Sequence, residues 1–223
     1  MFQIPKEILN LYIPYEFGQD VETADETDAM IEVEMQLPAE WTYTWGATQF
    51  VIMSKEWDYV FKIPFNGEWL FDYNNDESYF KEFDHNYGER ALERYKQAED
   101  AGIAFLFAPT TIACYSKNGY PIYIQPKIET FRETCAKHYQ EKTKEEKDSI
   151  KDFLMENYNS PTNRLAIDWQ YDVIKYYGKQ VLKNLLDFIY DYATQVTDLH
   201  YDNIGYNKEG KPVILDYSDY LED

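Results

Sequence analysis

Two segments near the end of the chain decide its interpretation: Thr197-Asp198-Leu199-His200-Tyr201-Asp202-Asn203 and Val213-Ile214-Leu215-Asp216-Tyr217. Asn203 follows Asp198 by five positions, and Asp216 ends the apolar run that begins at Val213. Between the two segments, Asn207-Lys208-Glu209-Gly210 predicts a tight turn. This order of acid, amide, turn, apolar strand and second acid is typical of a site that orients a hydroxyl and holds a metal ion on a nucleotide.

The same residues have a simpler explanation, because Asp and Asn favour turns through local hydrogen bonds. A single acid in a turn would carry little information. Here the offset between Asp198 and Asn203 occurs together with a following hairpin and a preceding apolar helix. This combination favours the nucleotide interpretation.

Length and composition predict one folded domain or two small lobes around a cleft. The chain has 223 residues, of which 44% are hydrophobic, enough for a packed core. Aromatic residues reach 18%, mainly through 22 Tyr, whose rings can be buried while their hydroxyl groups find partners. This composition argues against wholesale disorder.

The chain is strongly acidic, with 21 basic and 41 acidic residues and a net charge of −20. Such a charge repels the phosphates of nucleic acids and anionic membranes, so neither is expected as a direct partner. A basic protein partner remains open. Because ATP is itself an anion, a nucleotide cleft in this chain needs local lysine and Mg²⁺.

Cysteine usage and the lack of apolar spans predict a cytoplasmic protein. Cys114 and Cys135 are too few for a disulfide scaffold and lack zinc-ligand spacing, which predicts reduced thiols. The first residues lack the apolar stretch of a secretory signal, and no run reaches membrane-spanning length.

Hydrophobic periodicity predicts strands first and helices later, and therefore the α+β class. Apolar residues alternate with polar ones in the expected strands and recur every three or four positions in the expected helices. Asn118-Gly119 marks a hairpin turn, and Gly102 is expected to stop a helix. The expected elements are a strand over residues 31–37, strands within 41–65, a helix over 76–101, a hairpin of 110–116 with 120–125, one solvated helix within 131–158 and an apolar helix over 165–195.

The loop Asp198-Leu-His-Tyr-Asp-Asn203 resembles the catalytic loop of the protein kinase-like superfamily, whose H-R-D-L-x-x-x-N signature has the same offset. Val196 and Thr197 replace the His and Arg of that signature. The string is more similar to aminoglycoside and choline phosphotransferases. His200 is expected either to hydrogen-bond this loop or to pack it.

The resemblance implies a bilobal fold that binds ATP and Mg²⁺, with a strand-rich N-lobe and a reduced helical C-lobe. Asp198 would orient the acceptor hydroxyl in the reaction. Asn203 and Asp216 would bind the magnesium ion, with Asp216-Tyr-Ser in place of D-F-G.

The same resemblance extends to the first half of the chain. Tyr59-Val-Phe-Lys62-Ile-Pro64 resembles the V-A-I-K strand, whose lysine pairs with the nucleotide phosphates. On its own, a lysine between apolar neighbours either faces solvent or has its charge used. The remaining expected nucleotide-site residues are Gly46 and Thr48 in the phosphate-covering loop, Glu89 or Glu93 on a helix as the partner of Lys62, and Gln125 and Lys127 in an inter-lobe hinge.

The expected organisation is an acidic N-terminal extension (1–40), a nucleotide-binding N-lobe (41–128) and a minimal helical C-lobe (129–223). The sequence ends at Asp223, soon after Asp216, without the later helices on which protein kinases dock peptides. The expected acceptor is therefore a small molecule or a protein held by another surface. The alternative is a catalytically weak pseudokinase or an acidic binding or inhibitor protein. The size and element order are compatible with a phage or mobile-element protein.

Overall fold

The computed structural model of the chain describes residues 3–84, 86–138, 141–191 and 199–217. It confirms the α+β class, because helices accompany antiparallel sheets. The chain divides into two compact units. The first unit comprises Met1–Arg90 with Thr110–Pro126, and the second comprises Ala91–Pro109 with Lys127–Asp223.

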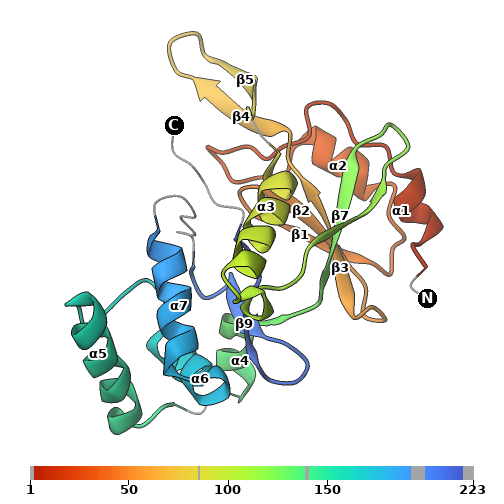
Figure 1. Cartoon of the computed structure of the whole chain (residues 1–223). Coiled ribbons are helices and arrows are strands. Elements are labelled where there is room, and N and C mark those ends of the chain that lie inside the picture. Colours follow the sequence, from red (N-terminus) through yellow and green to blue (C-terminus); the bar gives the residue numbers. More distant parts are fainter. Residues whose placement is uncertain (1–2, 85, 139–140, 192–198, 218–223) are drawn as a thin grey trace. The chain divides into compact units, whose positions relative to one another are not determined.

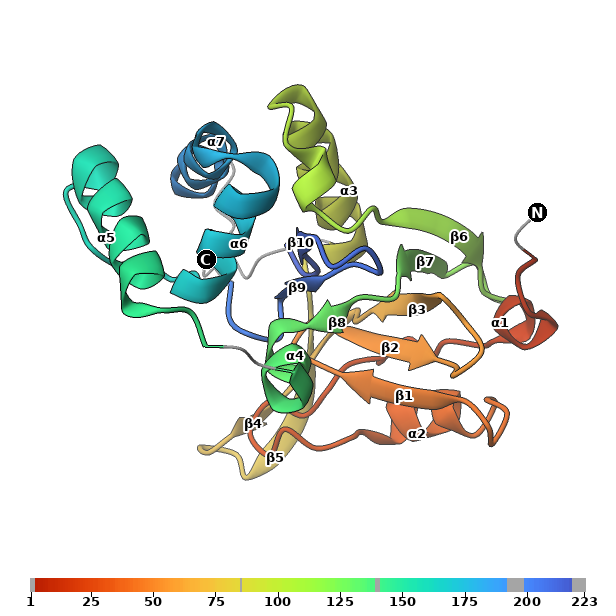
Figure 2. The ribbon, with the colours of Figure 1, turned by 90° about the horizontal axis from the view of Figure 1, so that it is seen from below.

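An antiparallel sheet of five strands forms the centre of the first unit (Figures 1 and 2). In spatial order the strands are β1 (Thr42–Trp45), β2 (Gln49–Met53), β3 (Tyr59–Pro64), β7 (Pro121–Pro126) and β6 (Thr111–Tyr115). The strands predicted within 41–65 and the hairpin of 110–116 with 120–125 are confirmed. At the hairpin turn Gly119 has a φ of +85°, a conformation that glycine adopts without steric cost.

One face of this sheet packs against the N-terminal part of the chain. The helices of this part are α1 (Lys6–Asn10) and α2 (Asp28–Glu34). Phe61 and Ile63 of β3 are buried in the same core as Ile8 of α1 and Val33 of α2. Residues 1–40 thus supply part of the core of the first unit.

The strand predicted over residues 31–37 is wrong, because Asp28–Glu34 forms helix α2. Met30 and Val33, three positions apart, are buried, whereas Ile31 and Met35 are exposed. Some of the apolar residues that suggested alternation therefore lie in solvent, so their spacing of two did not report burial on one side of a strand.

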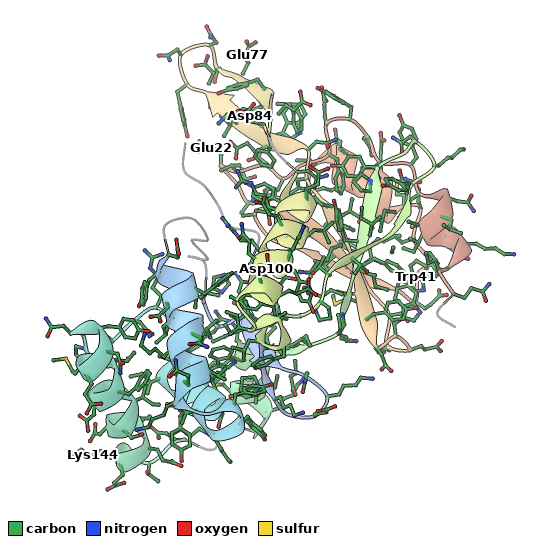
Figure 3. The ribbon with its side chains drawn as sticks, in the orientation of Figure 1. Glu22, Trp41, Glu77, Asp84, Asp100 and Lys144 are labelled. Atoms are coloured by element: carbon green, nitrogen blue, oxygen red, sulfur yellow. The ribbon has the colours of Figure 1, made fainter. Side chains whose placement is uncertain are left out.

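The helix predicted over 76–101 is correct only from Tyr87 onward. Its first part is a strand, and the elements here are β4 (Gly67–Asp72), β5 (Glu77–Glu82) and helix α3 (Tyr87–Asp100). Phe80 of β5 lies opposite Trp69 of β4, with 5.6 Å between their ring centroids, so aromatic pairing favours the hairpin over a helix. Glu77 lies in the outer part of this hairpin (Figure 3). Gly102, with a φ of +69°, follows the end of α3 as predicted.

The second unit is mainly helical, as predicted, but each expected helix is divided into two. Its elements are a 3₁₀ turn η1 (Ala104–Leu106), the helices α4 (Phe131–His138), α5 (Lys144–Tyr158), α6 (Ile167–Tyr177) and α7 (Lys179–Tyr190), and the strands β8 (Glu129–Thr130), β9 (Ile204–Tyr206) and β10 (Pro212–Ile214). Thr143 and Glu146 form a capping box that starts α5. Gly178, with a φ of +92°, separates α6 from α7. Within the described residues, no helix combines the length and apolar character needed to cross a membrane.

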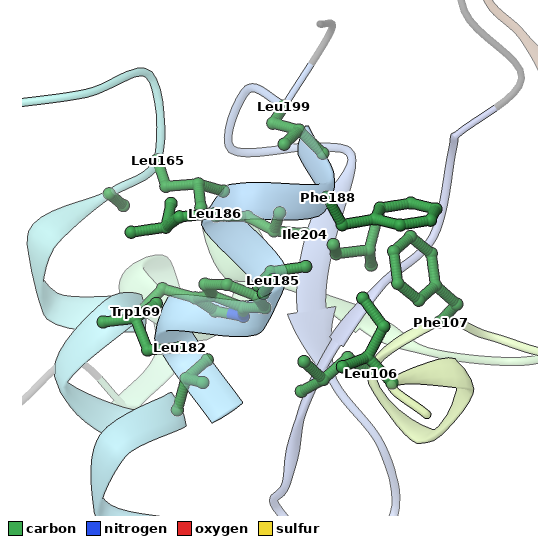
Figure 4. Packing of buried hydrophobic residues seen from close by; sticks show 14 of the residues in the cluster. Leu106, Phe107, Leu165, Trp169, Leu182, Leu185, Leu186, Phe188, Leu199 and Ile204 are labelled. Carbon is green, nitrogen blue, oxygen red and sulfur yellow. The ribbon is translucent and has the colours of Figure 1, made fainter. Parts of the chain in front are cut away.

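The core of the second unit joins α6 and α7 to the sheet of β10, β9 and β8 (Figure 4). Trp169 of α6 is completely buried, and its indole Nε1–H donates to the carbonyl oxygen of Gly205 on β9 at 3.0 Å. A β-carbon on Gly205 would lie 2.2 Å from the carbonyl oxygen of Glu129 on β8. Glycine at position 205 therefore allows the close approach of these two strands.

We expect Gly205→Ala to destabilise the chain by about 1–3 kcal/mol, because the new methyl group collides with the backbone of Glu129. Gly46→Ala is the matched control, since a β-carbon there meets no atom within 4 Å. Urea denaturation followed by circular dichroism measures both variants. Equal stability of Gly205→Ala and Gly46→Ala would contradict the assigned contact.

Candidate functional site

The hairpin of β9 and β10 brings Asn203 and Asp216 to the same end. Ile204 pairs with Ile214, and the ladder continues because the Leu215 N–H donates to the carbonyl oxygen of Asn203 at 2.8 Å. Asp216 is the next residue after Leu215. The two predicted metal ligands, thirteen positions apart in sequence, are therefore neighbours in the fold.

Tyr217 fixes the backbone directly after Asp216. Its side chain is buried, and its hydroxyl donates to the carbonyl oxygen of Ala108 at 2.7 Å. The Ala108 N–H in turn donates to the carbonyl oxygen of Ile214 at 2.8 Å, and the Phe107 ring packs 5.3 Å from the Tyr217 ring. Asp216 thus lies between two anchored positions, which limits its movement.

The loop before β9 is held by short-range hydrogen bonds. The Asn203 N–H donates to the carbonyl oxygen of His200 at 3.0 Å, and the Asp202 N–H donates to His200 Nδ1 at 3.1 Å. His200 therefore hydrogen-bonds the loop, the first of its two expected roles. Asp202 also pairs with Arg132 of α4 at 2.7 Å. Asp198, the expected catalytic acid, lies outside the described residues.

Lys62 lies on β3 in the first unit and is buried, with 8% of its surface exposed. In the register of the sheet it lies opposite Val51 of β2 and Tyr123 of β7. Burying an ammonium group is costly unless its charge is used. The alternative that Lys62 faces solvent is therefore excluded.

The turn between β1 and β2 is less suited to covering phosphates than its sequence suggests. The Gly46 N–H donates to the carbonyl oxygen of Gln49 at 3.1 Å, and nothing local requires glycine at position 46. Thr48 lies opposite Phe65, whose N–H donates to the Thr48 carbonyl oxygen at 2.9 Å. Phe65 belongs to the buried core, so Thr48 lies on the core face of the sheet, opposite to the face of Lys62.

Both helix glutamates expected as partners of Lys62 are exposed. Glu89 is exposed in the first turn of α3, and its charge acts on Tyr123, the residue opposite Lys62 in the sheet. Glu93 is exposed as well, and its carboxylate accepts from Gln97 Nε2 at 3.4 Å. A helical carboxylate as partner of Lys62 remains a prediction.

The boundary between the first and the second unit falls between Pro126 and Lys127, within the segment expected to be a hinge. Gln125 is buried and its side-chain Nε2 donates to the Thr110 hydroxyl at 2.9 Å, so this amide has a structural role. Lys127 is exposed. A role of this segment toward adenine would rest on the backbone.

A buried polar network that the motifs do not reveal supports the hairpin. Asp172 of α6 accepts from Lys142 Nζ at 2.7 Å and from the Tyr206 hydroxyl of β9 at 2.8 Å. Burial and the nearby Asp172 carboxylate raise the pKa of Tyr206, so this phenol stays protonated as a donor. The sequence signal is a pair of acids, Asp168 and Asp172, at helical spacing within a largely apolar helix, both of which are buried.

We expect Asp172→Ala to destabilise the chain by about 3 kcal/mol or more, because it leaves Lys142 and Tyr206 unpaired in a largely buried site. Asp148→Ala is the matched control, because Asp148 pairs with Lys151 on the surface, where such pairs contribute at most about 1 kcal/mol. Thermal and urea denaturation compare the two variants. Equal losses of stability would refute the assigned role of Asp172.

Comparison of the chain with models of protein families and with curated proteins finds no match. Lys62 lies in the first unit, and Asn203 and Asp216 lie in the second.

Proposed function

We propose that this chain is a kinase-like phosphotransferase that binds ATP with Mg²⁺ and moves the γ-phosphoryl group to a hydroxyl acceptor. The observation that carries this proposal is the hairpin that makes Asn203 and Asp216 neighbours, with Tyr217 anchored behind them. The spatial proximity of these two residues supports the nucleotide interpretation over the alternative that they only stabilise turns.

The donor atoms of the two side chains fit a magnesium ion. Amide and carboxylate oxygens are hard ligands, and Mg²⁺ commonly takes one or two carboxylates together with substrate phosphates and water. Among the described residues, no group of three or more His, Cys, Asp or Glu side chains could hold a metal by itself. In the proposal Asn203 and Asp216 therefore share the ion with the nucleotide.

The topology of the first unit supports a bilobal kinase-like fold as part of the proposal. Lys62 lies on the third strand along the chain, and helix α3 follows later, before β6. Only the first turn of α3 belongs to the first unit, because Ala91–Asp100 belong to the second. In protein kinases the phosphate-binding lysine also lies on the third strand and precedes a helix. The first unit would be the nucleotide lobe and the second unit would supply the metal ligands and the catalytic loop.

Each residue has a distinct task in the proposed reaction. Lys62 neutralises phosphate charge with a buried ammonium, which acts more strongly than an ammonium in water. Asp198 accepts a hydrogen bond from the acceptor hydroxyl and orients it. Bound magnesium supplies positive charge to the phosphates during transfer. Asn203 and Asp216 hold the position of that charge.

A binding protein built on the same fold is the second candidate function. It is favoured by the placement of Thr48 on the core face, because Thr48 was expected to contact the nucleotide. A chain with a net charge of −20 would then use its acidic surface toward a basic protein.

We expect ATP with Mg²⁺ to raise the melting temperature of the wild type by several degrees, because ligand at 100 times its Kd stabilises by about 2.7 kcal/mol. Asp216→Asn should lose this magnesium-dependent shift, whereas Asp148→Asn on the surface of α5 should retain it. Differential scanning fluorimetry measures all three proteins. No shift in the wild type at millimolar ATP would overturn the proposed function.

Turnover separates the enzyme from the binding protein. In an enzyme, Asp198→Ala should lower the rate of ATP-dependent phosphoryl transfer by about 10²–10⁴ while ATP affinity is kept. Lys62→Ala should weaken ATP binding itself. ATP consumption measures turnover, and calorimetry measures ATP binding. Full activity of Asp198→Ala would refute the catalytic role of Asp198.

A further inference from the structure

The Tyr123 side chain has a feature that packing does not explain. It is 1% exposed, yet among the described residues its hydroxyl has no hydrogen-bond partner. Most buried polar side-chain atoms in folded proteins have at least one partner. A buried hydroxyl without a partner is unfavourable unless another function retains it.

The position of Tyr123 connects it to the proposed nucleotide site. It lies directly opposite Lys62 on the neighbouring strand, so both side chains project from the same face of the sheet. Phe61 and Ile122, the residues that precede them, belong to the core on the other face. The Lys62 ammonium and the Tyr123 hydroxyl, which has no partner among the described residues, are therefore carried by adjacent residues on one face of the sheet.

The phenol is a permanent donor at physiological pH. Burial, followed by the charge of Glu89, raises the pKa of Tyr123 to about 12. The hydroxyl therefore stays protonated, and it can donate a hydrogen bond to an anion without competing for a proton.

The first turn of α3 packs closely against the Tyr123 ring at Gly88. A β-carbon on Gly88, in the first turn of α3, would lie 2.2 Å from the Tyr123 ring and 2.7 Å from its hydroxyl oxygen. Glycine at this position lets the turn rest on the ring without inserting a group of its own.

We propose that the Tyr123 hydroxyl is a ligand-contacting group of the Lys62 site and donates a hydrogen bond to a phosphate oxygen of the bound nucleoside triphosphate. This inference rests on the proposed function. It adds a neutral donor beside the ammonium and explains why a buried hydroxyl is kept without an internal partner.

The test compares Tyr123→Phe with Tyr120→Phe and the wild type. Tyr120 is the matched control, because its hydroxyl already has internal partners, the Pro64 carbonyl oxygen and Asn66 Oδ1, one of which accepts its proton. Calorimetry measures the Kd of Mg·ATP, and thermal denaturation without ligand measures stability. Tyr123→Phe should bind Mg·ATP about three- to tenfold more weakly while its melting temperature stays equal or rises. Tyr120→Phe should melt at a lower temperature and bind Mg·ATP like the wild type.

Three results would overturn the inference, and each differs from a failure of the proposed function. If Tyr123→Phe binds Mg·ATP as tightly as the wild type, the Tyr123 hydroxyl does not contact the ligand. A melting temperature lowered as much as in Tyr120→Phe assigns the hydroxyl a structural partner. An equal loss of affinity for adenosine assigns it to the nucleoside instead of the phosphates. In contrast, a wild type that does not bind Mg·ATP overturns the proposed function itself.

Discussion

The hydrogen bond from the Trp169 indole to the carbonyl oxygen of Gly205 is the contact on which the second unit depends. It fastens the most deeply buried aromatic residue of the helical core to the strand that follows Asn203. Because Gly205 also lies against the backbone of Glu129, β9 is fixed from both sides. Pairing with β9 positions β10, and Asp216 lies two residues beyond the last residue of β10. The neighbouring positions of Asn203 and Asp216 thus arise from core packing and backbone pairing.

Buried acidic groups of the second unit have positively charged or hydrogen-bonding neighbours, whereas most of the net negative charge lies on the surface. Within the second unit, the buried Asp172 is neutralised by Lys142 and by the Tyr206 hydroxyl, while Lys147 Nζ lies 3.9 Å from Asp168. The net charge of −20 therefore acts mainly from exposed groups, which salt screens effectively. In the proposed function an incoming nucleotide would meet this repulsive field first, so local positive charge would have to offset it at the phosphates. A buried lysine is well suited to this task, because its field is less screened.

The sequence predicted those parts of the fold that local pattern determines. The strands within 41–65 and the Asn118-Gly119 hairpin follow from alternation and turn chemistry, and the structure agrees. The strand over 31–37 failed because exposed Ile31 and Met35 mimicked alternation. In the site, the neighbouring positions of Asn203 and Asp216 were predictable from their order. The face of Thr48 and the exposure of Glu89 depend on register and helix rotation, and the lone hydroxyl of Tyr123 depends on what surrounds it in three dimensions. Such properties have no local sequence signal.

The hairpin of β4 and β5 belongs to the first unit, and its two ends lie side by side. The Phe83 N–H donates to the carbonyl oxygen of Asn66 at 2.8 Å, immediately beyond the two strands. The segment between them is therefore closed at its base, and β3 and α3 do not depend on its length for their own positions. Its strand β4 is also tied to the N-terminal segment, because the Trp69 N–H donates to the carbonyl oxygen of Gln19 at 3.0 Å and the Val21 N–H donates to that of Trp69 at 3.1 Å. In evolutionary terms the turn between β4 and β5 is therefore the part that can change in length or side chains while Lys62 keeps its place in the sheet. Variation among descendants of this chain is thus expected to accumulate there first, since loop-like insertions of this kind tolerate change best.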